Sequence, residues 1–236
     1  MKKLFIFGVI VLVSWLSITY FILNREEKGR QLVTDAYYGD LLAVKSDVEE
    51  GAPLDFEFYF QDDKRQYNGI WFNALHAAAS GGNEDIINFL LEQGFNINTQ
   101  TPNGWTPLFI AARDGQAEAA KLLIFRGANL NIQTDQGATP LLMVLTQPFE
   151  NEKARTDLLW YLLRRGADAN LPDFNGFPPI YYAVLSQKPE LVEALLEYDA
   201  IPPRPMLEQL FSFLEKQSAL PAKKITALLK KRLSEK

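Results

Sequence analysis

The fold is decided by residues 103–131, which read NGWTPLFIAARDGQAEAAKLLIFRGANLN. Thr106 is suited to capping a helix, because its hydroxyl accepts a hydrogen bond from an otherwise unpaired backbone N–H, and Pro107 fits the first turn, where no N–H is needed. The alanines that follow let this helix approach a neighbour closely, and Gly115 permits a left-handed turn into a second helix. We therefore predict a helix-turn-helix unit.

The second helix of this unit is expected to end at Gly127, because glycine adopts the left-handed conformation that closes many helices. Leu122, Leu123 and Phe125 are expected to supply its core. One such unit cannot bury its apolar face alone, but stacked units share a continuous core.

The same pattern recurs along most of the chain, with glycines at the ends of the second helices. These glycines, and the residues that replace them in the last unit, are Gly39 and Gly51, Gly82 and Gly94, Gly115 and Gly127, Gly166, and finally Gln187 and Asp199. The pattern resembles the ankyrin repeat, whose period is about 33 residues. The resemblance implies an all-α fold, a solenoid of helix-turn-helix units with hairpin loops, with about five repeats over residues 30–201.

Two insertions interrupt the period. Residues 56–72 are aromatic and charged and contain Asn68-Gly69, a hairpin signal, so we expect a long finger there. Residues 146–152 are inserted between the inner and outer helices of a later unit. Breaks in a repeat map to loops on one face.

The C-terminal segment, residues 202–236, departs from the repeat after Pro202-Pro203. Apolar spacing predicts helices over 206–217 and 222–233, which are expected to cap the stack. The segment is basic, and we interpret its charges as a solvated helix face rather than a membrane or nucleic-acid patch. They belong to Lys223, Lys224, Lys230, Lys231, Arg232 and Lys236.

The N-terminus predicts one transmembrane helix. After a short tail, residues 1–3, the run 4–23 contains no charged residue, and a helix of that length spans roughly the 30 Å of a bilayer core. We interpret 4–23 as an uncleaved signal anchor, followed by a linker over 24–29. A cleaved signal peptide is the alternative, although its apolar region is usually shorter and Ser17-Ile18-Thr19 is a poor cleavage site.

Lys and Arg are nearly balanced on the two sides of this run, so the positive-inside rule does not decide its orientation. The start with Lys2-Lys3 is typical of bacterial export signals. We therefore expect a single-pass protein of the bacterial inner membrane, with a cytoplasmic N-terminus and periplasmic repeats.

The chain offers little catalytic chemistry. Cysteine is absent, which excludes disulfides, thiolate metal sites and a cysteine nucleophile, and the formal net charge of −5 gives nucleic acid no obvious reason to bind. His76 stands at the histidine position of the resembling repeats, which implies a structural hydrogen bond to backbone between repeats. Asp62-Asp63 beside Lys64-Arg65 is interpreted as a solvated loop, because an acid/base pair needs a shaped pocket. We expect no enzyme activity, no cofactor, no metal and no small-molecule substrate.

What remains is a surface for binding another protein. The resemblance implies that ligands are held by the hairpin tips and by the two residues that follow the alanine pair of each inner helix. The candidate residues at the tips are Phe72, Asn103, Trp105, Asp135, Gln136, Phe174 and Phe177. Those on the inner helices are Tyr37, Tyr38, Arg113 and Asp114, with Ser80, Thr146, Gln147, Leu185 and Ser186 in the same register.

Aromatic residues and arginine are frequent anchors of protein interfaces, so this row is a candidate ridge of binding residues. The alternative is that Phe72 and Phe177 pack between adjacent hairpins. We expect an adaptor that holds a partner at the membrane. A second hypothesis is an inhibitor or immunity protein, in which the finger over 56–72 enters the active site of a toxic enzyme.

Overall fold

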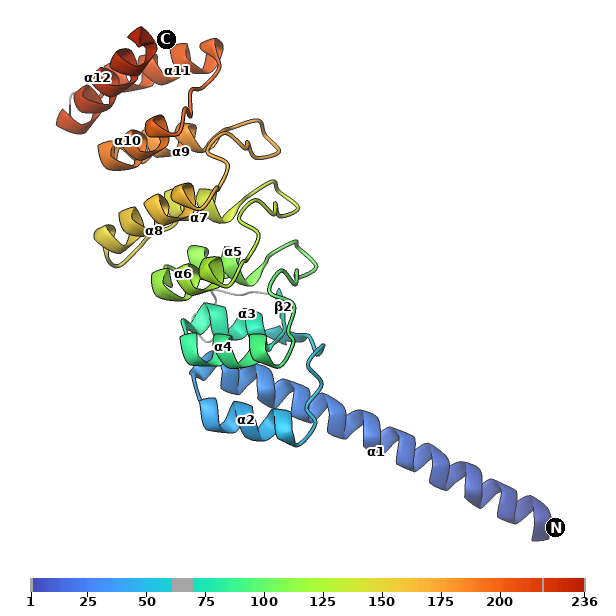
Figure 1. Ribbon diagram of the computed structural model, residues 1–236. Helices are drawn as coiled ribbons and strands as arrows, with labels where there is room; N and C mark the ends of the chain where they lie inside the picture. The colour runs from blue at the N-terminus through green and yellow to red at the C-terminus, as the bar shows by residue number, and fades with distance from the viewer. Residues whose placement is uncertain (1, 61–69, 218, 236) are drawn as a thin grey trace. The chain divides into compact units, whose positions relative to one another are not determined.

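The computed structural model describes residues 2–60, 70–217 and 219–235, with side chains from residue 18 onward except those of Phe60 and Ile70. The described chain divides into two compact units, unit 1 over Met1–Phe95 and unit 2 over Asn96–Lys236. Both are mostly helical, as Figure 1 shows.

Unit 1 begins with one long helix, α1 (Lys2–Tyr38), which packs against α2 (Leu41–Glu49) and α3 (Ala74–Gly81). The helix α4 (Glu84–Glu92) follows α3 after a left-handed turn at Gly82, whose φ is +72°. The last turns of α1 bury Leu32, Val33 and Ala36 in the core of the unit. The end of α1 thus serves as the inner helix of the first repeat.

Residues 24–29 differ from the predicted linker, because they are helical and belong to α1 without a break. Side chains hold the returning chain against them. Arg25 pairs with Asp55 at 3.0 Å, and Lys28 pairs with Glu50 at 3.4 Å. Gly29 lies so close to the ring of Phe56 that a Cβ there would collide with it. These contacts stabilise helix where the sequence suggested a spacer.

The insertion over 56–72, where a finger was predicted from a hairpin signal, contributes two short paired strands, so the fold is mostly helical rather than all-α. Strand β1 (Phe58–Phe60) pairs antiparallel with β2 (Ile70–Phe72), with Tyr59 opposite Trp71. Those two rings meet edge to face at 5.8 Å and are about half exposed. Residues 61–69, which contain Asp62-Asp63, Lys64-Arg65 and Asn68-Gly69, lie outside the described residues.

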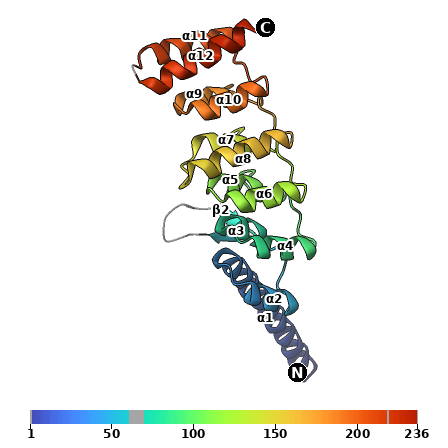
Figure 2. The same ribbon diagram turned by 60° about the vertical axis from the view of Figure 1, so that its left-hand side comes forward.

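Unit 2 continues the repeat with three pairs of helices, which follow one another in Figures 1 and 2. Each inner helix begins at a proline, and successive inner helices pack against one another, α5 against α7 and α7 against α9. The pairs are α5 (Pro107–Arg113) with α6 (Ala117–Phe125), α7 (Pro140–Thr146) with α8 (Glu152–Arg164), and α9 (Pro179–Leu185) with α10 (Pro189–Glu197).

The predicted helix starts and turns are confirmed. The hydroxyl oxygen of Thr106 accepts a hydrogen bond from the N–H of Phe109 at 3.1 Å, and Pro107 is the first residue of α5. Gly115 has a φ of +73°. Gln187 and Asp199, which replace glycine in the last repeat, have φ values of +55° and +57°. The backbone therefore keeps the turn of the repeat where the sequence has lost the glycine.

Two details differ from the prediction. The insertion over 146–152 lies partly in a loop and partly in α8, which has 13 residues where α6 has 9. Its Phe149 is buried beside Gly115, and the guanidinium of Arg155 lies 5.2 Å from the Phe149 ring. Phe125, expected in the core, is 68% exposed. It falls on the outward face of α6, whereas Leu123 is buried.

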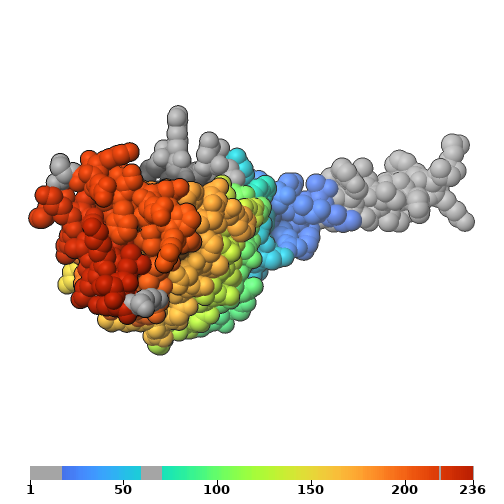
Figure 3. All heavy atoms as spheres, turned by 90° about the horizontal axis from the view of Figure 1, so that it is seen from above, coloured from blue at the N-terminus to red at the C-terminus, as the bar shows by residue number. Residues whose placement is uncertain are grey.

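The helices α11 (Arg204–Glu215) and α12 (Leu220–Ser234) lie where C-terminal helices were expected, although α11 begins and ends two residues earlier than the predicted 206–217. In unit 2, α12 packs against α10 and α11. Figure 3 shows α11 and α12 at the end of this unit. Each buries apolar residues on one face: Leu207, Leu210 and Leu214 in α11, and Ala222, Ile225 and Leu229 in α12.

Among the residues that the structure describes, no helix is both long enough and apolar enough to cross a membrane. The predicted anchor over 4–23 falls mostly on residues 2–17, whose side chains lie outside the described part of the chain. The anchor therefore stays a prediction.

Candidate protein-binding surface

The tips of three successive hairpins in unit 2 are joined by backbone hydrogen bonds. The N–H of Asp135 donates to the C=O of Asn103 at 3.2 Å, and the N–H of Phe174 donates to the C=O of Gln136 at 3.2 Å. We call the tips 102–104, 135–137 and 174–176 the hairpin ledge. Figure 1 shows these hairpins one after another beside α5, α7 and α9. The bonds make three separate loops into one continuous surface.

Each tip is also fixed internally by a side chain that accepts hydrogen bonds from the backbone of its own turn. Thr101 accepts from the N–H of Trp105 at 3.1 Å, and Thr134 accepts from the N–H of Ala138 at 3.2 Å. Asp173 takes this place in the third hairpin and accepts from the N–H of Phe177 at 2.9 Å. Such local bonds favour turns, so the ledge holds its shape without a partner.

Asp173 and Tyr182 form a strong hydrogen bond, in which the Tyr182 hydroxyl donates to the carboxylate at 2.6 Å. Burial raises the pKa of Tyr182 to about 12, helped by this bond to Asp173. Burial also acts to raise the pKa of Asp173, but hydrogen bonds from Tyr182, Phe177 and Asn175 outweigh it and leave that pKa below its ordinary value. The carboxylate is therefore ionised at neutral pH and anchors the third hairpin to α9.

Trp105 and Arg113 meet where the first hairpin joins α5. The Arg113 guanidinium lies 4.6 Å from the Trp105 ring centroid, and the Trp105 ring contacts Phe109 with centroids 5.3 Å apart. Arg113 also pairs with Asp114 at 3.7 Å. Trp105 is half-buried, so one part of its ring packs within the unit and another part remains accessible.

A second aromatic cluster joins the third hairpin to α9. The rings of Phe177 and Tyr181 stack with centroids 4.4 Å apart, and Tyr181 meets Tyr182 edge to face at 5.6 Å. All three are half-buried. Sequence reasoning found Phe177 but missed Tyr181 and Tyr182. The signal was present, because Tyr181 stands at the position that His76 has in its own repeat.

The predicted surface residues of unit 2 fall into two groups. Asn103, Asp135, Gln136 and Phe174 are exposed along the ledge, and Phe174 is 68% exposed. Arg113, Phe177, Gln147 and Ser186 are half-buried, while Thr146 and Leu185 are exposed on the inner helices. The side chain of Asp114 is only 3% exposed and is held by Arg113. Asp114 therefore supports the surface from within.

The predicted surface residues of unit 1 differ in their exposure. Tyr38 is 74% exposed and meets the half-buried Tyr37 edge to face at 5.2 Å. Phe72 is fully buried and stacks on His76 with ring centroids 5.8 Å apart. The packing alternative therefore holds for Phe72. Ser80 is buried as well.

His76 has a structural role. It is buried, its Nδ1 accepts a hydrogen bond from the N–H of Asn73 at 3.3 Å, and its own N–H donates to the Asn73 side chain at 3.1 Å. This reciprocal pair is a capping box at the start of α3. Across the described part of the chain, no group of three or more His, Asp or Glu side chains is placed to hold a metal ion.

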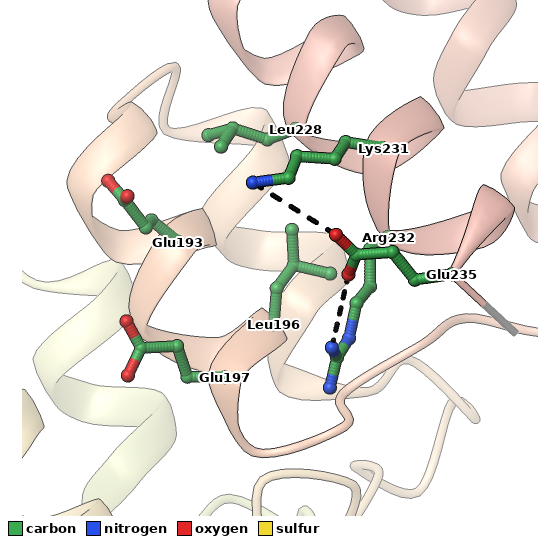
Figure 4. A pocket seen from close by; sticks show the side chains of 7 residues that line it. All are labelled: Glu193, Leu196, Glu197, Leu228, Lys231, Arg232 and Glu235. Atoms are coloured by element: carbon green, nitrogen blue, oxygen red, sulfur yellow. Dashed lines mark hydrogen bonds and ion pairs between the residues drawn. The ribbon is translucent and has the colours of Figure 1, made fainter.

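Three of the basic residues near the C-terminus, Lys224, Lys231 and Arg232, are paired with acids. Lys224 pairs with Glu190 at 3.7 Å, and Arg232 pairs with Asp199 at 2.7 Å. Figure 4 shows a small cavity lined in part by Arg232, about 170 Å³, where the side chains of Lys231 and Arg232 meet Glu235. Charges of both signs line it, so it shows no preference for an anionic surface or nucleic acid.

Comparison with known proteins agrees with this geometry. Residues 36–134 match the family model of ankyrin repeats, which spans three copies. The resemblance to ankyrin repeats is thereby confirmed for this part of the chain. The mouse (Mus musculus) RelA-associated inhibitor is 35% identical over 80 residues, which are 34% of this chain and 8% of that protein. The aligned segment thus spans a small fraction of the relative's length.

Proposed function

We propose that this chain binds another protein through the hairpin ledge and the aromatic clusters beneath it. Ankyrin repeats are protein-interaction modules, and the chain contains them. The observation that carries the proposal is the pair of backbone hydrogen bonds that joins the three tips, because they hold Asn103, Asp135, Gln136 and Phe174 in fixed positions before binding. A surface that is already ordered loses less entropy when a partner docks.

The half-buried aromatic clusters supply the binding energy in this proposal. Trp105 under Arg113, and Phe177 with Tyr181, are rigidly packed on one side and accessible on the other. Large aromatic side chains with few free rotamers are favoured at interface hot spots. In this proposal the hairpin ledge positions the partner, and the aromatic clusters supply most of the binding free energy.

We further propose that the chain is an adaptor in the bacterial cell envelope, anchored by residues 4–23 in the inner membrane with its repeats in the periplasm. The uncharged run supports this, as does the basic start of the chain. The continuity of α1 also favours it, because a helix that runs from the anchor into the first repeat would hold that repeat at a set distance from the bilayer.

The alternative is an inhibitor or immunity protein. The hairpin of β1 and β2 favours it, because Tyr59 and Trp71 form an exposed aromatic pair at the base of the insertion. The name of the mouse relative, an inhibitor, is consistent with this class, although only 8% of that protein is aligned.

One experiment separates these proposals. The intact chain is purified from its own membrane with its bound proteins, and the captured protein is bound again to wild-type chain, to Trp105→Ala and to Glu118→Ala. Glu118 pairs with Lys121 on the outer helix α6 and is the matched surface control. The adaptor predicts stoichiometric binding that is lost in Trp105→Ala only and leaves the partner's activity unchanged. Loss of the partner's enzymatic activity on binding would favour the inhibitor, and equal binding by both variants would remove the ledge from the interface.

A further inference from the structure

The hairpin ledge follows one rule at each junction. At each junction, a residue of the later hairpin donates its backbone N–H to a backbone C=O of the hairpin before it in the chain. Asp135 donates to Asn103, and Phe174 donates to Gln136. We call the later hairpin the incoming hairpin, and we call the accepting C=O the tip carbonyl. The residue after each tip carbonyl is a glycine with positive φ, Gly104 at +79° and Gly137 at +78°.

These glycines make room for the incoming backbone. A Cβ on Gly104 would lie 3.0 Å from the Cα of Thr134, and a Cβ on Gly137 would collide with the backbone of Phe174. Glycine is therefore required at each junction for two reasons. Its φ is positive, and the next hairpin occupies the space that a side chain would need.

The third hairpin has an equivalent tip carbonyl, that of Asn175, and an equivalent glycine, Gly176, but no further hairpin packs against them in the described part of the chain. In the described part of the chain, the C=O of Asn175 accepts no hydrogen bond, and a Cβ on Gly176, whose φ is +82°, would meet no atom within 4 Å. Phe174, Asn175 and Gly176 are all exposed. The connection from α10 to α11 runs through Pro202 and Pro203 and brings no further hairpin, as Figure 1 shows.

The opposite end of the ledge is closed to a second copy of this chain. The residue that would donate from the first tip is Pro102, which has no N–H. The N–H groups of Asp135 and Phe174 are already used inside the unit. No tip in the described part of unit 2 is therefore able to donate to Asn175 of another copy.

We propose that the open junction at Asn175 and Gly176 is a docking site for a hairpin tip of a different protein. The occupant carries the four-residue pattern of the incoming tips, Thr134 to Gly137 and Asp173 to Gly176: a Thr or Asp that fixes the turn, a residue with a free N–H, any residue, and glycine. Its N–H donates to the Asn175 carbonyl, and its backbone lies over Gly176. This is recognition by addition to an open hydrogen-bonded edge.

This inference goes beyond the proposed function, because it does not depend on the aromatic cluster at Trp105. The donor position accepts either Asp or Phe in this chain, since Asp135 and Phe174 both occupy it. Specificity therefore lies in the turn residue, the glycine and the free N–H.

The probe for the test is a synthetic peptide with the sequence of residues 170–180, NLPDFNGFPPI, which carries the incoming tip of the chain itself. It is titrated to millimolar concentration against the intact, isotope-labelled chain in detergent micelles, and the backbone amide signals are followed by NMR. We expect saturable shifts at Asn175 and Gly176. A peptide with an N-methyl group on the Phe174 equivalent cannot donate and should bind about tenfold more weakly.

The matched variants are Gly176→Asn and Gly127→Asn. Asn tolerates positive φ better than other residues, and both glycines have open space around the missing side chain, with φ values of +82° and +92°. Gly176→Asn should weaken peptide binding about tenfold by filling the docking space, and Gly127→Asn should leave it unchanged. Trp105→Ala should also leave it unchanged, even if it abolishes binding of the natural partner.

Three outcomes would overturn the proposal: no shift at Asn175 and Gly176, equal affinity for the N-methyl peptide, or equal weakening by the two asparagine variants. Concentration-dependent dimerisation of the peptide-free chain that Gly176→Asn abolishes would also overturn it, because the occupant would then be a second copy.

Discussion

Arg232 of α12 donates a hydrogen bond to the carboxylate of Asp199 at 2.7 Å, and Asp199 holds the left-handed conformation that ends α10. A φ of +57° strains most residues other than glycine, although Asp tolerates it better than most. The ion pair with Arg232 offsets part of this strain and ties the last helix to the last repeat.

Gln187 has the same backbone conformation, with φ of +55°. Its side chain is neutral, so it has no ion pair that could offset the strain. Gln187→Gly should therefore raise the free energy of unfolding by about 0.5–1 kcal/mol. Asp199→Gly should raise it by about 0.5 kcal/mol less, because Asp tolerates this conformation better than Gln and because the change also removes an exposed pair. Denaturant unfolding at low and high salt measures the difference, which should shrink as salt screens the pair. A difference that does not change with salt would show that Arg232 contributes nothing.

Gly115 and Ala111 test the packing of the repeats. Gly115 has a φ of +73° with ordinary space around a Cβ, and Ala111 is fully buried. Gly115→Val and Ala111→Leu should each lower the free energy of unfolding by about 1–3 kcal/mol, through backbone strain and overpacking respectively. Unfolding midpoints report both changes, with Glu118→Ala, expected within about 0.5 kcal/mol of wild type, as the control.

The success of these sequence predictions has a local cause. Thr106, Pro107 and Gly115 each meet a requirement of the backbone within a few residues of their own position. The helix starts and turns could therefore be predicted from the sequence alone. The glycines of the hairpin ledge can be recognised in the same way once the sequences of the hairpins are aligned.

The failures come from contacts between distant residues. The helix over 24–29 depends on Arg25 with Asp55 and on Gly29 against Phe56. The exposure of Phe125 depends on which face of α6 the neighbouring helices cover. The open junction at Gly176 depends on the absence of a hairpin before α11. None of these is encoded in a short window of sequence.

Asp47 should make the stability of unit 1 depend on pH. Burial first, and then the carboxylates of Asp35 and Glu50, raise its pKa to about 6, against a lowering effect of Lys28. A carboxyl whose pKa is raised on folding binds its proton more tightly in the folded state. Its contribution to stability is therefore complete below the unfolded pKa of about 4 and is lost as pH rises through about 6.

Asp47→Asn should raise the free energy of unfolding at about pH 7.5 by about 1 kcal/mol and change it little near pH 4. The figure is reduced from the full shift because Asp47 is only partly buried and solvent screens its neighbours. Denaturant unfolding at the two pH values measures it. Asp40→Asn is the control, because Asp40 caps α2 through the N–H of Ala43 and asparagine caps equally well. A pH-independent effect of Asp47→Asn would contradict the assignment.

The anchor over 4–23 is tested by fractionation. The intact chain should remain with the membrane after carbonate extraction and expose its repeats to protease added outside the cytoplasmic membrane. Leu12→Arg places a charge in the middle of the run, at a cost of about 2.5–3.5 kcal/mol for membrane insertion, and should shift the chain to the soluble fraction. Glu26→Arg, on the flank, should not. A soluble product starting near Tyr20 would show cleavage instead.

Trp105 and Tyr38 are the last pair to test, one in each unit. Tyr38 is 74% exposed, and Trp105 is half-buried beneath Arg113. If they anchor a partner, Trp105→Ala and Tyr38→Ala should each weaken binding by about 1–4 kcal/mol. Tyr38→Ala should leave the unfolding midpoint unchanged, whereas Trp105→Ala also removes its contact with Phe109 and should lower the midpoint slightly. Binding and unfolding must therefore be measured on the same samples. Full affinity in both variants would move the recognition surface to the exposed pair Tyr59 and Trp71 on the hairpin, where the inhibitor hypothesis puts it.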